Sequence, residues 1–373
     1  MELQPVPGPI RATGDVMRCD LLPPAARRAC RRIPRPTASA ALLLPCLLAG
    51  TAAAAAPPSA TPPSYDMGGT DFVADMVREH GFERDALAAL MADARYQQRI
   101  IDAMNRPYEA KPWRAYRALF ITPERIAGGV AFRRDNDALL RRAEAAYGVP
   151  PEIITAIVGV ETNYGRHLGD HRVLDALSTL GFSYPKRAAF FRGELEEFLL
   201  LARDEQVDPR AVKGSYAGAV GKPQFIPSSY RAYAVDFDAD GRRDLWGSDA
   251  DVIGSVGNYL AQNGWRRGEP VAAPVVLSAG PPAGIEIATK RPVRPELTVQ
   301  RLADAGVQAA ADAPGAPETT RAVLIELDGD GPEYWLGFDN FYAITRYNNS
   351  NLYAMAVYQL SREIARRQGG EGG

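Results

Sequence analysis

Apolar residues recur every three or four positions between residues 72 and 147, which is the spacing of one face of an α-helix. The positions that show this best are Leu87, Leu90, Met91, Ile100, Ile101 and Met104. Prolines, which end or interrupt helices, divide the stretch at Pro107, Pro112 and Pro123. The pattern therefore predicts an N-terminal helical subdomain over residues 70–147, built from several short helices.

The next predicted element is an apolar helix that begins at Pro151 and leads to Glu161. Proline is favoured at the first position of a helix, and Gly165 is a stop signal a few residues after Glu161. Amphipathic helical stretches between Phe182 and Leu199 follow. We assign residues 148–266 to a central, mainly helical core.

The pattern changes between residues 267 and 335. Val271–Leu277 and Arg321–Leu327 are short runs rich in Val, Leu and Ile, and stretches rich in Pro, Gly and Ala separate them, as expected for strands of a small sheet. Residues 336–366 return to the core and end in a helix from Leu352 to Arg366, and we expect a disordered tail at 367–373. The predicted fold class is mainly α, of the α+β kind, with a small inserted β subdomain.

The first 56 residues differ in composition from the rest. Seven arginines precede an apolar run from Ala38 to Gly50, and alanines occupy positions 52–56. This order describes an export signal, and the apolar run is shorter than the about 20 residues that a membrane-spanning helix needs. We expect an export signal at 1–56, a flexible linker at 57–69 and a periplasmic protein without a membrane-spanning segment in its mature form. A membrane-anchored N-terminus is the alternative.

All three cysteines, Cys19, Cys30 and Cys46, fall in this leader. Its removal would leave a mature protein with neither disulfides nor a cysteine-based metal site. Leu44 and Pro45 precede Cys46, whereas lipoprotein cysteines usually follow a small residue, so we do not expect a lipid anchor.

Removal of residues 1–56 would take away seven basic and three acidic residues, leaving 36 Lys+Arg against 42 Asp+Glu and a net charge of −6. No block of Lys or Arg remains in that sequence, which argues against nucleic acid or an anionic membrane surface as the main partner. A polysaccharide recognised by hydrogen bonds and stacking needs no basic patch.

Glu161 follows Ile154, Ile157 and Val158 by seven, four and three residues, so its carboxyl shares the face that a globular protein buries. Burial removes hydration, raises the pKa of a carboxyl group and keeps a proton available near neutral pH. Such a group is suited to general acid catalysis. The alternatives are a buried glutamate paired with an arginine and a glutamate that reaches solvent at the helix end.

Two later segments are rich in groups that can bind a sugar. Residues 215–230 combine glycines, which let backbone approach a ligand closely, with the hydroxyls of Ser215 and Tyr216 and the amide of Gln224. Residues 340–350 supply aromatic rings and amides. Sugars have apolar ring faces and hydroxyl edges, which these side chains match. Ordinary turns or packing motifs are the alternative for either segment.

Three motifs occur here in the order found in the B-type lytic murein transglycosylases: Glu161-Thr-Asn-Tyr-Gly-Arg, Ser215-Tyr-Ala-Gly-Ala-Val-Gly and Asn340-Phe-Tyr-Ala-Ile-Thr-Arg-Tyr-Asn. The chain resembles this family of bacterial cell-wall enzymes over roughly residues 70–365. The resemblance implies a lysozyme-like catalytic core and peptidoglycan glycan strands as substrate. It also implies cleavage of the β-1,4 bond between N-acetylmuramic acid and N-acetylglucosamine with formation of a 1,6-anhydromuramic end. Enzymes of cell-wall synthesis are candidate protein partners, for which the sequence offers no direct evidence.

By position in the matching motifs, the resemblance makes Glu161 the single catalytic residue, which acts first as acid and then as base. It assigns Ser215 and Gln224 to hydrogen bonds with the saccharide around the scissile bond. The residues that it places along the groove are Tyr116, Tyr259, Tyr342, Tyr347 and Asn348. The chemistry requires no cofactor. Lys222 stands where the family often has another residue, and its charge would suit the lactyl or peptide carboxylates of the substrate.

Carboxylates at alternate positions with a glycine in sixth place, Gly241, are typical of the opening of a calcium-binding loop. The twelfth position is Gly247 instead of a bidentate glutamate, but the family's version of the loop is longer. The predicted ligands over residues 236–251 are Asp236, Asp238, Asp240, the carbonyl of Arg242 and Asp251, with Asp244 in the ninth place and Asp249 as the alternative closing residue. We therefore expect a structural calcium site, and an acidic turn capped by its own backbone is the alternative.

Two other functional classes stay open at this point. The chain has further acids that could serve as a second carboxylate, so spacing alone does not exclude a muramidase, which is a hydrolase. These acids include Asp170, Asp175, Glu194, Glu196 and Glu197. A wall-binding protein without catalytic activity would bind sacculi and release no fragments, but the intact Glu161 motif counts against it.

Overall fold

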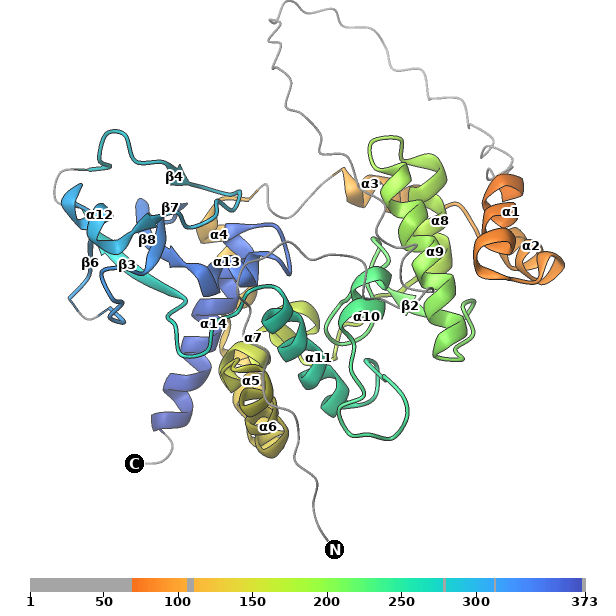
Figure 1. Cartoon of the computed structure of the whole chain (residues 1–373), viewed down its shortest axis with the longest axis horizontal. Helices are drawn as coiled ribbons and strands as arrows, with labels where there is room; N and C mark the ends of the chain where they lie inside the picture. Colours follow the sequence, from red (N-terminus) through yellow and green to blue (C-terminus); the bar gives the residue numbers. More distant parts are fainter. Residues whose placement is uncertain (1–68, 106–110, 278–279, 312, 371–373) are drawn as a thin grey trace, which may run out of the picture. The chain divides into compact units, whose positions relative to one another are not determined.

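Helices dominate the part of the chain that the computed structural model describes, which is residues 69–105, 111–277, 280–311 and 313–370 (Figure 1). All of these residues lie within the unit Ala60–Gly373. The predicted export signal with its three cysteines, and positions 57–68 of the predicted linker, lie outside the described residues.

Short helices follow one another from residue 69 to residue 147, in line with the periodicity of that stretch. They are α1 (Gly69–His80), α2 (Arg84–Ala92), α3 (Gln98–Met104), α4 (Trp113–Phe120), α5 (Pro123–Asp135) and α6 (Asp137–Tyr147). Residues at the caps determine where several of these helices begin or end. The Thr122 side chain accepts the amide of Arg125 where α5 starts. Gly148, with φ 74°, ends α6 in the left-handed region.

Helix α7 (Pro151–Thr162) contacts α5, α6, α11 and α14, so neighbours surround it (Figure 1). Nearly all of its residues are buried, which explains why its sequence is apolar all round. The other elements of the central core are β1 (His171–Arg172), α8 (Val173–Ser183), α9 (Ala188–Asp204), β2 (Lys213–Gly214), α10 (Pro227–Tyr233) and α11 (Asp249–Gln262). Strands β1 and β2 pair antiparallel, with His171 opposite Gly214.

The predicted small sheet is present and has its own apolar core. Its elements are β3 (Ala272–Val276), β4 (Ile287–Ala288), β5 (Leu297–Thr298), α12 (Val299–Asp304), β6 (Gln308–Ala309), β7 (Arg321–Asp328) and β8 (Pro332–Phe338). The strand order is β4-β7-β8-β3-β6, and β5 also pairs with β7. Strand β8 passes the expected limit at residue 335, because Leu336 pairs with both Leu324 and Ala273.

The chain returns to the core through α13 (Asp339–Thr345) and α14 (Asn351–Gly370). Helix α14 lies beside α7 and α5 (Figure 1). The expectation of a disordered tail from residue 367 is wrong for residues 367–370, which continue α14. Arginine and glutamine favour helix, and glycine comes only at positions 369 and 370. Within the described ranges, no helix combines the length and apolarity needed to cross a membrane.

Candidate active site

A tight turn directly follows Glu161. Helix α7 ends at Thr162, and Asn163, Tyr164 and Gly165 have φ values of 50°, 61° and 86°. Left-handed backbone is uncommon for residues other than glycine, so other contacts must hold this turn in place. The Thr162 hydroxyl accepts the amide of Gly165 at 3.0 Å, and the amide of Asn163 donates to the Gly159 carbonyl at 3.0 Å.

Tyr164 anchors the turn against two helices. Its ring packs on glycines of α5 and α7. A Cβ atom added at Gly128, Gly129 or Gly159 would lie within 2.9 Å, 2.5 Å and 2.6 Å of the Tyr164 side chain. The Tyr164 hydroxyl donates to the carbonyl of Arg125 at 2.8 Å. These glycines therefore provide the space for the ring that fixes the turn after Glu161.

The carboxyl of Glu161 accepts a hydrogen bond from the hydroxyl of Tyr353, with 2.6 Å between Oε1 and the phenolic oxygen. Tyr353 is buried in α14. Burial raises the pKa of Glu161 to about 7, and the Tyr353 hydrogen bond partly opposes this rise. Burial and the neighbouring Glu161 hold the pKa of Tyr353 well above its ordinary value, so its hydroxyl keeps its proton. The partner of Glu161 is therefore a tyrosine and not the arginine that the alternative interpretation of a buried glutamate supposed.

Aromatic rings continue from Tyr353 toward the 220–225 segment. Tyr347 stacks on Tyr353 with ring centres 6.3 Å apart and lies 4.7 Å from Tyr259 and 5.7 Å from Phe225. The Tyr347 hydroxyl donates to the carbonyl of Pro223 at 2.6 Å. The structure thus brings together the three segments that carry the sequence motifs.

Ser215 and Gln224 are half-buried and lie in one loop, where both side chains form hydrogen bonds with the backbone. The Ser215 hydroxyl accepts the amides of Ala217 and Ala219 at 3.2 Å and 3.0 Å, which leaves its proton for donation. The Gln224 amide nitrogen donates to the carbonyls of Leu168 and Gly221 at 3.2 Å and 3.0 Å. Its Oε1 is the atom suited to accept from a ligand hydroxyl.

The residues predicted to line a groove divide into two groups. Tyr116 and Tyr259 are 2% and 8% exposed and present little ring surface. Tyr259 packs within the aromatic cluster against Tyr347, whereas Tyr116 packs against Trp113 and Phe120. A tyrosine has an apolar ring and a polar hydroxyl, so the same residue type can pack in a core or contact a ligand. Tyr342, Tyr347 and Asn348 are half-buried and keep surface that a ligand could contact.

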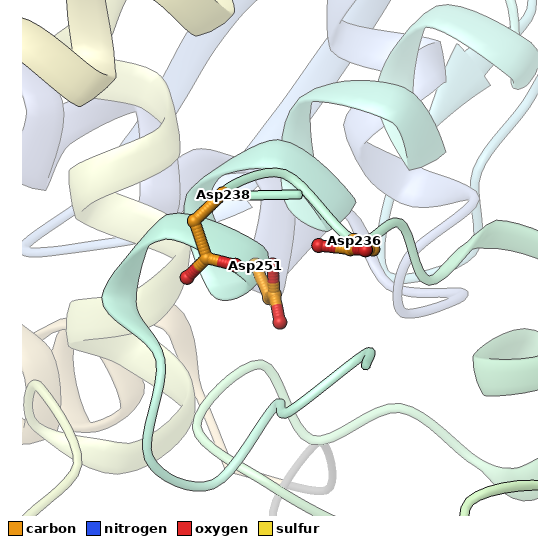
Figure 2. A group of neighbouring side chains, drawn as sticks. All are labelled: Asp236, Asp238 and Asp251. Carbon is orange, nitrogen blue, oxygen red and sulfur yellow. The ribbon is translucent and has the colours of Figure 1, made fainter. Parts of the chain in front are cut away.

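The acidic loop gathers a subset of the predicted metal ligands (Figure 2). Oxygen atoms of Asp236, Asp238 and Asp251 lie within 4.8 Å of one another. Asp240, also a predicted ligand, lies outside this group, and its carboxylate accepts the amide of Arg242 at 2.9 Å. Arg242, whose carbonyl was the predicted ligand atom, contributes its backbone amide to this turn as a hydrogen-bond donor.

The two acids considered as substitutes in that loop have other partners. Asp244 accepts the amides of Trp246 and Gly247 at 2.8 Å and 2.9 Å. Asp249 binds the ammonium group of Lys222 at 2.6 Å. Asp251, in the first turn of α11, is therefore the acid that closes the cluster.

Sequence reasoning missed Tyr353. It lies in an apolar stretch of α14 between Leu352 and Met355, and a tyrosine in such a stretch is expected to be a core residue. The only available signal was chemical, because a buried tyrosine hydroxyl requires a hydrogen-bond partner. That signal does not say which of many groups the partner is.

Comparison with known proteins places this geometry among cell-wall enzymes. Residues 68–362 match the family model described as the transglycosylase SLT domain. The chain is 45% identical over 307 residues to membrane-bound lytic murein transglycosylase B of Escherichia coli strain K12, covering 79% of this chain and 81% of that protein.

Solved structures agree with this match. The soluble lytic transglycosylase SltB1 of Pseudomonas aeruginosa has a TM-score of 0.74 and 49% identity, covering 80% of this chain and 98% of that one. Escherichia coli lytic transglycosylase Slt35 in complex with calcium has a TM-score of 0.72 and 45% identity, covering 80% and 93%.

Proposed function

The chain belongs to the lytic transglycosylase family defined by the SLT domain, and we propose that it cleaves peptidoglycan glycan strands without consuming water. The bond broken is the β-1,4 linkage between N-acetylmuramic acid and N-acetylglucosamine, and the product carries a 1,6-anhydromuramic end. One observation supports this above all. Glu161 has a pKa of about 7 and a tyrosine bound to one carboxyl oxygen, in a site built from three motif segments.

In the proposed reaction, neutral Glu161 donates its proton to the glycosidic oxygen while the bond from that oxygen to C1 breaks. The transition state has oxocarbenium character. The Glu161 carboxylate then accepts the proton of the muramic C6 hydroxyl as O6 bonds to C1. The proton that left Glu161 is replaced, so the enzyme returns to its starting state.

Tyr353 would orient the carboxyl through both steps. Its hydroxyl occupies Oε1, which leaves Oε2 to carry the proton that is transferred. The high pKa of Tyr353 supports this role, because the phenol remains a donor when Glu161 is an anion. Ser215 and Gln224 would bind the sugar hydroxyl or N-acetyl groups, with Tyr342, Tyr347 and Asn348 contributing contact surface.

A hydrolase with two carboxylates is the main alternative, and contacts of the candidate acids argue against it. Four of the five acids considered for that role are engaged with other residues. These pairs are Asp175 with the amide of Arg95, Glu194 with Ser228, Glu196 with His80, and Glu197 with Arg231. The fifth, Asp170, is exposed. The contacts of the four engaged acids support chemistry in which Glu161 acts as the only catalytic carboxylate.

We also propose that the cluster of Asp236, Asp238 and Asp251 holds a calcium ion with a structural role. Calcium ligands lie at about 2.3–2.6 Å from the ion, so oxygen atoms within 4.8 Å of one another, as in this cluster, are close enough to share one ion. Burial and the two neighbouring carboxylates raise the pKa of Asp251, and a cation would offset that repulsion. Bound calcium would supply positive charge that braces the 236–251 loop.

Periplasmic action is part of the proposal because peptidoglycan lies outside the cytoplasm. Residues 1–56 carry the sequence features of an export signal. Fusion of residues 1–56 to a reporter that is active only after export tests this point. Loss of export on replacement of the apolar run Ala38–Gly50 by polar residues is the expected result.

Digestion of purified sacculi tests the activity. Mass spectrometry of the released muropeptides should show anhydro ends, which are lighter by one water than the reducing ends that a muramidase makes. Reducing ends would identify a hydrolase. Sacculus binding without any released fragment, in wild type as in Glu161→Gln, would identify a binding protein.

A further inference from the structure

Lys222 contacts the turn after Glu161 through its main chain and its side chain. Its carbonyl accepts the hydroxyl of Thr162 at 2.8 Å, and Thr162 directly follows the catalytic glutamate. Its methylene groups lie over Gly165, since a Cβ atom built on Gly165 would be 3.1–3.3 Å from Cε, Cδ and Cγ of Lys222. Both ends of the left-handed turn are therefore in contact with one lysine.

The charged end of Lys222 points to a different element. Its Nζ lies 2.6 Å from Oδ1 of Asp249 and 3.4 Å from the carbonyl of Gly247. The Lys222 side chain is 16% exposed and the Asp249 side chain 36%, so solvent screens this half-buried ion pair in part, through the aspartate. The backbone amide of Lys222 also donates to the Leu245 carbonyl at 2.8 Å. Lys222 thus joins the catalytic turn to residues 245–249.

Asp249 is itself held in position. It lies in the first turn of α11, and Ser248 caps that helix by accepting the amide of Asp251 at 3.2 Å. The Ser248 hydroxyl donates to Asp238 at 2.8 Å. The Asp251 carboxylate accepts the amides of Phe237 and Asp244 at 2.6 Å and 2.7 Å. The acidic loop therefore gives Asp249 a defined place from which to hold the lysine.

We propose that Lys222 is a positioning residue for Glu161, which it serves by tying the turn at Thr162–Gly165 to Asp249 and the acidic loop. This inference rests on the proposed function. It replaces the sequence-based hypothesis that the Lys222 charge binds lactyl or peptide carboxylates of the substrate, because Asp249 already occupies the ammonium group.

The proposal makes a distinct kinetic prediction. A loosened turn displaces the Glu161 carboxyl from the glycosidic oxygen, which slows proton transfer without removing a contact to the glycan. Misplacement of a reacting group by about 1 Å can lower a rate up to about a hundredfold. Lys222→Met keeps the methylene stem and loses the charge, so we expect kcat to fall about tenfold with KM changed by less than about twofold.

The experiment measures kcat and KM on peptide-bearing and peptide-free glycan strands for wild type, Lys222→Met, Asp249→Asn, the double variant and Lys222→Arg. The double variant should be no slower than either single variant, because both remove the same ion pair. Lys222→Arg retains the charge and should recover most of the lost kcat. Lys186→Met removes an exposed lysine before α9 and is the matched control. Thermal unfolding curves confirm that each variant is folded at the assay temperature.

Three outcomes would overturn the inference. Wild-type kcat in Lys222→Met would show that the ion pair does not position Glu161. A rise in KM confined to peptide-bearing strands, with kcat intact, would show that the ammonium group binds substrate. Additive losses in the double variant would show that Lys222 and Asp249 act separately. Failure of the proposed function itself is distinguishable, because wild-type enzyme would then release no anhydro products.

Discussion

The phenolic oxygen of Tyr353 lies 2.6 Å from Oε1 of Glu161, and 192 positions of sequence separate the two residues. This contact acts on the pKa of Glu161 in the direction opposite to burial. Burial disfavours the carboxylate, whereas the donated hydrogen bond favours it. The value of about 7 is the balance between the two.

Replacement of Tyr353 by phenylalanine removes the donor and leaves the burial. The pKa of Glu161 should then rise above about 7, so the neutral acid persists to higher pH. We expect the alkaline limb of the kcat profile to move to higher pH, while kcat at its optimum falls about tenfold because the carboxyl loses its orienting bond. Muropeptide release measured across pH 5–9 checks this (about two units either side of the pKa).

Tyr358→Phe is the matched control for that experiment. Tyr358 lies on the same helix, and its hydroxyl donates to the Ala272 carbonyl at 2.9 Å. Its loss should lower stability by about 1 kcal/mol and leave the pH profile in place. An alkaline limb that moves to lower pH in Tyr353→Phe would contradict the assigned hydrogen bond.

Glu161→Gln should abolish muropeptide release, with a loss of at least about two to four orders of magnitude, and retain binding to sacculi. It should also change how stability depends on pH. The folded state binds a proton at Glu161 up to about pH 7, whereas an unfolded chain releases it near its ordinary value of 4.5. Wild-type stability therefore falls as pH rises through this interval, by about 1–3 kcal/mol from this residue.

A glutamine side chain does not titrate, so position 161 of the variant adds no pH dependence to the free energy of unfolding. Above pH 7, the Glu161→Gln variant should unfold at a higher temperature than wild type, and near pH 4 the difference should disappear. Thermal unfolding at matched ionic strength measures this. Equal melting temperatures at every pH would show that position 161 is well solvated in the folded protein.

Gly159→Ala tests the packing of Tyr164. The added methyl group would lie 2.6 Å from the Tyr164 hydroxyl oxygen, so either the ring or α7 must move. Overpacking of this kind costs about 1–3 kcal/mol, and displacement of the turn should also lower kcat. Gly193→Ala in α9 is the control, because a methyl group there meets nothing within 4 Å and should be neutral or stabilising. Denaturant unfolding gives both values, and a Gly159→Ala protein as stable as wild type would refute the packing argument.

Calcium should stabilise the protein through the acidic loop. A ligand present at a hundredfold excess over its Kd stabilises the folded state by about 2.7 kcal/mol, so the melting temperature should rise with added calcium and fall on chelation. Asp238→Asn should remove most of that response. Asp330→Asn, at the exposed turn between β7 and β8, should retain it. If chelation changes neither the melting temperature nor activity, the loop is an acidic turn without a metal.

Much of the fold followed from local pattern. Proline at the start of α7, the apolar run behind it and the glycine after it predicted where the helix lies and that Glu161 ends on a buried face. Strands β3 and β7 were likewise visible as two short runs rich in Val, Leu and Ile, whereas strand β8 was not predicted. Of the carboxylates predicted as calcium ligands, Asp251 lies with Asp236 and Asp238 in one cluster, whereas Asp240 caps the amide of Arg242. Aspartates at alternate positions predict an acidic turn. Which of their carboxylates lie close together depends on small rotations of the backbone.

What the sequence by itself determined is the set of surfaces that must be buried and the residues that carry chemistry, because both depend on residue type and on spacing along one element. Only the tertiary structure decided the partners: Tyr353 for Glu161, and Asp249 for Lys222. It also decided that Tyr116 and Tyr259 are buried. The physical reason is that periodicity specifies which face of a helix avoids water but not which other element covers it. Contacts between distant segments depend on how all the elements pack together.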